Sequence, residues 1–155
     1  MIIIVNSENV FKTKVSLEWL EDLTFKINFQ NSNLPDLIID ETHDVESPEA
    51  LGPDPSKLLV SAVMGCLNAS FAFCLKKARI PLKRMTAIGE LISKRNEGLW
   101  RVSQINVELR PEVEEGIPRL EKCIEIFHKY CTVTESVRQG IPVNVTFNRD
   151  NVKSN

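Results

Sequence analysis

The sequence lacks the short motifs that mark the common nucleotide-binding and hydrolytic folds. It has no Gly-x-Gly-x-x-Gly, no Walker loop and no Gly-x-Ser-x-Gly, so it indicates no dinucleotide site, ATP site or serine-hydrolase nucleophile. It also lacks an excess of one charge, because 19 basic and 21 acidic residues leave a formal net charge of −2. We therefore expect neither nucleic acid nor an anionic membrane surface as a partner.

The N-terminus lacks both parts of a secretory signal. No basic segment precedes the apolar run at residues 2–5, and that run is shorter than the roughly 7–15 residues that a signal requires. We therefore expect a cytoplasmic protein whose thiols stay reduced. Zinc-ribbon spacing is absent as well, since seven residues separate Cys66 from Cys74 and Cys123 from Cys131, and ribbons have two to four. No metal site is expected.

What the sequence does contain is a regular succession of strand and helix patterns. Alternating apolar residues predict a hairpin from 13–19 and 24–29, a short strand at 36–40, a second hairpin from 84–94 and 99–110, and a last strand at 141–147. Asn96-Glu97-Gly98 is the predicted turn of the second hairpin. Strands grouped in this way predict an α+β class with antiparallel sheets. We expect one domain over residues 1–155, with its core at about 13–147 and a frayed tail at 148–155.

Three helices are predicted between these strands. The first runs from Pro55 to about residue 79, with Asp54 as its N-cap. Pro118 opens the second, whose buried stripe is Leu120, Cys123, Ile124, Phe127 and Tyr130. The third begins at Thr132, which forms a capping box with Glu135, and ends at Gly140.

The first predicted helix carries no charge from Leu58 to Leu75. This run only just reaches the roughly 18–20 residues that span a bilayer, and four polar or small residues lower its hydrophobicity, so we do not expect a membrane protein. A helix that is apolar on all sides is otherwise fully buried. A chain of 155 residues has difficulty covering so long a helix, and we therefore predict a homodimer in which a second chain covers the remaining face.

Cys66 and Cys131 are the candidate reactive residues, and each has two interpretations. Cys131 directly precedes the third helix, whose positive end would lower the pKa of its thiol; it also fits as a small apolar residue that closes the preceding stripe. Cys66 lies in mid-helix, where a cysteine is usually part of the core, and its thiolate needs a cation or donor from elsewhere. Cys74 and Cys123 are interpreted as core residues.

Two segments resemble the OsmC/Ohr family of osmotically inducible and organic-hydroperoxide-resistance proteins. Residues 52–59, Gly-Pro-Asp-Pro-Ser-Lys-Leu-Leu, together with Gly65-Cys66 resemble its first cysteine motif, and residues 130–134, Tyr-Cys-Thr-Val-Thr, resemble its Cys-Pro-Val-Ser motif. The hairpin at residues 15–25 is similar to that of the YhfA-like branch. The resemblance covers residues 13–147.

This resemblance implies an OsmC-like fold, an intertwined homodimer and a thiol-dependent peroxidase without a cofactor. Cys66 would attack a hydroperoxide and become a sulfenic acid, and Cys131 would condense with it to a disulfide that a dithiol reduces. Active members hold the thiolate with an arginine from the N-terminal strands and have a glutamate ten residues before the first cysteine. Here the first arginine is Arg79, and Ser56 stands at the glutamate position.

Four residues are therefore candidate accessory groups: Glu46, Glu49, Ser56 and Lys57. Two functions other than a peroxidase remain open. The first is a binding protein that holds an apolar small molecule or fatty acid in a pocket at the dimer interface, with Cys66 in the pocket wall. The second is a structural or interaction protein with inert cysteines.

Overall fold

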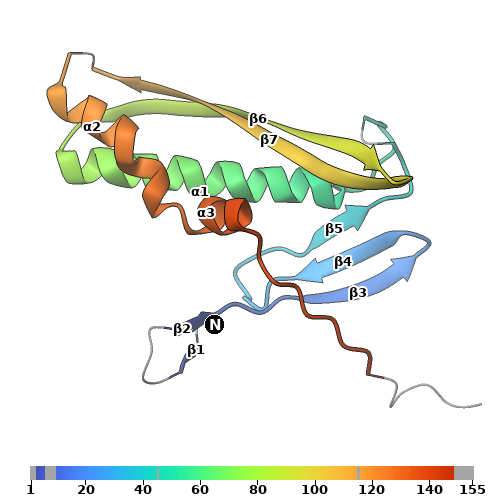
Figure 1. Cartoon of the computed structure of the whole chain (residues 1–155). Helices are drawn as coiled ribbons and strands as arrows, with labels where there is room; N and C mark the ends of the chain where they lie inside the picture. Colours follow the sequence, from blue (N-terminus) through green and yellow to red (C-terminus); the bar gives the residue numbers. More distant parts are fainter. Residues whose placement is uncertain (1–2, 6–9, 45, 115, 149–155) are drawn as a thin grey trace, which may run out of the picture. The chain divides into compact units, whose positions relative to one another are not determined.

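The computed structural model describes residues 3–5, 10–44, 46–114 and 116–148, and they form an α+β structure (Figure 1). In chain order the elements are β1 (Ile3–Val5), β2 (Val10–Lys12), β3 (Ser16–Glu21), β4 (Thr24–Asn28), β5 (Leu37–Asp40), α1 (Pro55–Ala78), β6 (Leu82–Asn96), β7 (Leu99–Val113), α2 (Pro118–Ile126), a 3-10 helix η1 (Phe127–Tyr130) and α3 (Thr132–Gln139). The predicted fold class is confirmed.

The strands pair as neighbours along the chain. β3, β4 and β5 form a three-stranded antiparallel sheet, while β1 pairs with β2 and β6 with β7. Both predicted hairpins and the short third strand are thus confirmed. The turn between β6 and β7 has Glu97 and Gly98 at φ 49° and 81°, the left-handed conformation of two-residue hairpin turns. The predictions did not include β1 and β2.

Helix α1 begins and ends where local chemistry dictates. Asp54 caps it, since its Oδ1 accepts hydrogen bonds from the backbone N–H of Ser56 at 2.6 Å and of Lys57 at 3.1 Å. At the other end Arg79 takes φ 57° and the Ile80 N–H donates to the Leu75 carbonyl at 2.9 Å. This is the 6→1 bond of a left-handed helix terminus, and both predicted boundaries are correct to about one residue.

The chain forms two compact units. One comprises residues 1–62 and 89–107, and the other residues 63–88 and 108–155. The core of the second unit contains Phe71, Leu75, Ile80, Leu120 and Cys123, with partly buried side chains from β6, β7 and η1 packed around it. The prediction of a single domain stays a prediction.

Burial of α1 follows one stripe rather than its whole circumference. Its buried residues are Val63, Leu67, Phe71 and Leu75, spaced four apart, whereas Gly65, Ala69 and Phe73 are exposed. The expectation that the single chain leaves one face of this helix uncovered agrees with this exposure, and the homodimer that would cover that face stays a prediction. The single chain has enough apolar surface to cover one face only.

The predicted strand at 141–147 is absent, because residues 140–148 take no regular structure. Its four alternating apolar side chains are exposed: Ile141 57%, Val143 82%, Val145 73% and Phe147 86%. A strand requires a hydrogen-bonded neighbour, and the described residues supply none for this segment. The predicted tail falls, apart from Asn148, outside the described residues.

The buried stripe predicted for residues 120–130 was wrong at two positions. Leu120 and Cys123 are buried, but Ile124 and Tyr130 are exposed. At Tyr130 the reason is that α2 stops at Ile126 and continues as the 3-10 helix η1. A 3-10 helix has three residues per turn, so the α-helical spacing no longer keeps Tyr130 on the buried side.

Asp40, at the end of β5, organises the loop before α1. Its side chain accepts hydrogen bonds from the backbone N–H of Leu51 at 2.9 Å and of Thr42 at 2.8 Å, and from the Thr42 hydroxyl. His43 Nδ1 lies 3.2 Å away. These hydrogen bonds hold the pKa of the Asp40 carboxyl far below its usual value, and the one from the Leu51 N–H has the largest effect.

The low pKa of Asp40 predicts acid sensitivity. The carboxylate stabilises the fold above its unfolded pKa of about 3.9, and this contribution is lost as pH falls through the folded pKa. We expect Asp40→Asn to lower the urea midpoint at pH 7 and to flatten its decline between pH about 4 and 2. Asp44→Asn, an exposed change in the same loop, is the control. Equal pH slopes for wild type and Asp40→Asn would contradict the assignment.

Candidate active site

Cys131 occupies the N-cap position of α3. Its backbone has φ −84° and ψ 96°, and its carbonyl accepts the Glu135 N–H at 3.0 Å. The predicted capping box was therefore shifted by one residue: Thr132 is the first residue of the helix, and the cap makes no side-chain hydrogen bond to the backbone. The Cys131 thiol is buried and instead hydrogen-bonds the Thr134 hydroxyl, with 2.9 Å between Sγ and Oγ1.

Cys66 of α1 lies against this same helix start. Its sulfur accepts hydrogen bonds from the Cys131 thiol, from the backbone N–H groups of Val133 and Thr134, and from the Ser70 hydroxyl. Ser70 reaches it because residues four apart share one face of a helix. Figure 1 shows α3 beside α1. The two cysteines predicted as reactive are thus brought together, although 65 positions separate them in the sequence.

The surroundings push the pKa values of the two thiols in opposite directions. Burial raises the pKa of Cys66, but the hydrogen bonds from Cys131 and from the start of α3 outweigh it, and the pKa ends below its usual value. Burial and the adjacent Cys66 raise the pKa of Cys131. The prediction that the helix start leaves Cys131 with a lowered pKa was wrong: hydrogen bonds from the hydroxyl and the backbone N–H of Thr134 do lower it, but burial and the adjacent Cys66 outweigh them.

The arrangement therefore supplies one ionisable sulfur with one protonated neighbour. Backbone N–H groups at a helix start carry partial positive charge and stabilise an anion there. A thiolate held in this way is the nucleophilic form of the side chain.

The candidate accessory residues divide into two places in the other unit. Glu46, Ser56 and Lys57 line a cavity of about 330 Å³ together with Asp54, whose Oδ2 is buried and has no hydrogen-bond partner among the described residues. Glu49 instead lies 3.6 Å from His43, measured from Oε2 to Nε2. An accessory role for any of them in the chemistry of Cys66 stays a prediction.

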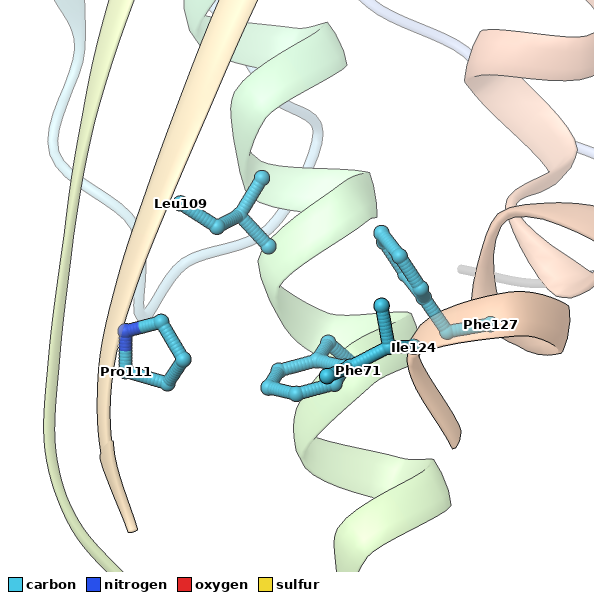
Figure 2. A pocket seen from close by; sticks show the side chains of 5 residues that line it. All are labelled: Phe71, Leu109, Pro111, Ile124 and Phe127. Atoms are coloured by element: carbon cyan, nitrogen blue, oxygen red, sulfur yellow. The ribbon is translucent and has the colours of Figure 1, made fainter. Parts of the chain in front are cut away.

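An apolar cavity lies in the same unit as the two cysteines. It measures about 190 Å³ and is lined by Phe71, Leu109, Pro111, Ile124 and Phe127, which point toward one another from α1, β7, α2 and η1 (Figure 2). The rings of Phe71 and Phe127 meet edge to face, with centroids 5.2 Å apart. The lining offers no hydrogen-bonding side chain, so the cavity suits a hydrocarbon group.

Sequence reasoning missed the donors that hold the Cys66 sulfur. Ser70 had a readable signal, since it lies four positions after Cys66 on the predicted helix. The N–H groups of Val133 and Thr134 had none, because every residue but proline has one and only the fold aims them.

Ser70 provides a direct test of the hydrogen bonds around Cys66. We expect Ser70→Ala to raise the pKa of Cys66, because a hydrogen bond that favours the thiolate is lost. The measurement is the rate of Cys66 alkylation by iodoacetamide against pH, followed by mass spectrometry. Ser61→Ala, an exposed change on the same helix, should leave the profile unchanged. An unshifted profile for Ser70→Ala would remove Ser70 from the site.

Comparison with known proteins places this site in a family. Residues 47–146 match the family described as OsmC-like protein. The chain belongs to the OsmC-like family. This segment contains both cysteine motifs, so the resemblance to the OsmC/Ohr family is confirmed, while the YhfA-like branch stays a prediction. No curated protein shows a significant sequence match.

Solved structures show the same fold. An OsmC-like protein of unknown function from Vibrio cholerae matches with a TM-score of 0.67 and 17% identity over 81% of this chain and 92% of that one. An OsmC-like protein from Mycoplasma pneumoniae gives 0.67 and 15% identity over 82% and 87%. An organic hydroperoxide resistance protein from Elizabethkingia anophelis gives 0.62 and 13% identity over 85% and 91%.

Helix α1 of this OsmC-like protein is long and apolar enough to cross a membrane by length and composition alone. Core helices of soluble proteins meet the same criterion, and a single such helix is weak evidence for a span. Phe71 and Leu75 of α1 belong to the buried core of their unit. We therefore interpret α1 as a core helix.

Proposed function

We propose that this OsmC-like protein is a thiol-dependent peroxidase that reduces organic hydroperoxides through Cys66 and Cys131. The observation that carries the proposal is the sulfur of Cys66, which accepts hydrogen bonds from the start of α3 and from the Cys131 thiol. Two solved relatives of the same fold are named organic hydroperoxide resistance proteins. We also propose a cytoplasmic location, where a dithiol reductant would keep the four thiols reduced.

The reaction begins at Cys66. Its thiolate attacks one oxygen of the hydroperoxide, the O–O bond breaks, and the alkoxide leaves as an alcohol after taking a proton. Cys66 is then a sulfenic acid. The Cys131 sulfur attacks the oxidised sulfur, its proton leaves with the hydroxyl as water, and a disulfide forms. A dithiol reduces this disulfide by exchange and restores both thiols.

The N–H groups at the start of α3 replace the charge that an arginine would supply. Two N–H donors and a hydroxyl stabilise the Cys66 thiolate before the attack. They do not require a charged side chain to be buried, which would itself cost desolvation energy. The lack of an arginine before residue 79 is therefore compatible with an ionised Cys66.

Hydroperoxide consumption in the presence of a dithiol tests the function. We expect purified protein to consume cumene hydroperoxide with dithiothreitol, and Cys66→Ser to lower the rate by at least about a hundredfold, because the attacking sulfur is lost. Cys74→Ser makes the same change two helical turns away and should retain the rate. If wild type consumes no more peroxide than Cys66→Ser, Cys66 is not the attacking residue and the proposed function fails.

The apolar cavity favours a second function, the binding of a small hydrophobic molecule. Its five lining residues include no cysteine, so ligand binding there does not require thiol chemistry. A fatty acid or similar ligand retained in native mass spectrometry, and lost on Ile124→Glu, would support it. A wild-type protein that retains none of the added ligand would not.

A further inference from the structure

Cys74 and Cys123 form a second cysteine pair, separate from the candidate active site. Cys123 of α2 is only 3% exposed and belongs to the core of its unit, and Cys74 of α1 packs against that same core. The two thiols share a hydrogen bond. Sequence analysis assigned both residues to the core without pairing them.

The two cysteine pairs join the same two stretches of chain, residues 66–74 and 123–131, in antiparallel order. Cys74 lies eight residues after Cys66 on α1, and Cys123 lies eight residues before Cys131. Eight residues of α-helix advance by about 12 Å. The second pair is therefore about two helical turns from the first along α1, with Ser70 between Cys66 and Cys74. At that separation, a thiol of one pair does not reach a disulfide of the other.

The surroundings of the second pair differ from those of the first. Phe71, Leu75 and Leu120 surround it as members of the same core. Burial and, to a smaller extent, the contact with Cys74 raise the pKa of Cys123 to about 11. Since the thiolate is the reactive form, Cys123 is a poor first nucleophile. Cys74, which is partly exposed, is the residue that an oxidant reaches.

We propose that Cys74 and Cys123 are a second dithiol, which closes to a disulfide under hydroperoxide stress and links α1 covalently to α2. The Cys74 sulfur attacks the hydroperoxide, which leaves as an alcohol, and Cys74 becomes a sulfenic acid. Cys123 then attacks that sulfur and water leaves. Two thiols thus supply the two electrons and two protons that convert one hydroperoxide into alcohol and water.

The consequence is a reversible cross-link in the core of this unit. The bond would close a loop of about 50 residues, and such bonds raise stability by restricting the unfolded chain. It would also protect Cys74 from irreversible oxidation to the sulfinic acid. The inference does not depend on peroxidase activity at Cys66, since the oxidant reacts at Cys74 itself.

The double variant Cys66→Ser/Cys131→Ser isolates the second pair. After treatment with tert-butyl hydroperoxide we expect an intact mass lower by about 2 Da, no thiol available to alkylation in denaturant, and a Tm higher by roughly 5–10 °C. A dithiol should reverse all three changes. Adding Cys123→Ser to this double variant should abolish the 2 Da loss and leave Cys74 as a sulfinic acid.

Wild-type protein provides a second measurement that does not depend on the folding of variants. No lysine or arginine lies between Cys66 and Cys74, so trypsin must be combined with chymotrypsin, which cleaves after Phe71 and Phe73. Non-reducing digests of oxidised protein should contain a peptide of Cys74 linked to one of Cys123. Sulfinic Cys74 beside an alkylatable Cys123, or a bond between two chains, would overturn the proposal.

Discussion

Cys131→Ser is expected to stop the catalytic cycle after the first chemical step. The variant keeps the N–H groups of Val133 and Thr134 that face Cys66, so its Cys66 should still attack one hydroperoxide. Without the second thiol, Cys66 should remain a sulfenic acid that dimedone labels. The concentration of peroxide that inactivates the protein should fall at least about tenfold, because the sulfenic acid is free to react further.

The comparison that decides this prediction is between Cys131→Ser and Cys123→Ser. Both remove a buried thiol, but only Cys131 contacts Cys66. Wild type and Cys123→Ser should form the Cys66–Cys131 disulfide and carry no dimedone on the Cys66 peptide. Equal dimedone labelling of wild type and Cys131→Ser would show that Cys131 does not resolve the oxidised Cys66.

The second large effect concerns the homodimer, which we propose on the basis of uncovered apolar surface. Residues 141–147 alternate apolar and polar, yet their apolar side chains are exposed in the single chain. A face of this kind is normally buried against another strand or sheet. We infer that a second copy of the chain covers it and gives the segment the strand structure that its pattern predicts.

Charges on the apolar face should therefore break the dimer. We expect wild type to have the mass of a dimer in light scattering, and Val143→Asp/Val145→Asp to have that of a monomer with a lower Tm, because an unpaired charge is costly to bury. Asn144→Asp/Thr146→Asp adds the same charge to the alternate positions and should remain dimeric. A monomeric wild type would refute the proposal, as would a dimer that both double variants retain.

The sequence by itself determined most of the secondary structure. Period-two alternation located β3, β4, β6 and β7, and Asp54 and the residues before Pro81 located the ends of α1. These features depend on neighbours within a few positions, which a sequence displays directly. The two cysteine motifs were likewise readable, and they identified the family that residues 47–146 later confirmed.

The tertiary structure decided which of the two thiols has the lower pKa. From the sequence, the start of α3 was expected to act on Cys131, its own N-cap residue. In the fold the N–H groups of Val133 and Thr134 also reach Cys66 on another helix and lower its pKa, whereas at Cys131 burial and the adjacent Cys66 outweigh the hydrogen bonds from Thr134 and raise the pKa. A hydrogen bond depends on the direction of the donor in space, and the packing of α3 against α1 sets that direction.

The same reason explains the second cysteine pair and the missing last strand. Whether Cys74 meets Cys123 depends on the register of α2 against α1, and whether residues 141–147 form a strand depends on a neighbour. Local propensity fixes neither, since both are contacts between segments far apart in the chain or between chains. The sequence determined most of the elements and the candidate reactive residues, and packing determined their partners.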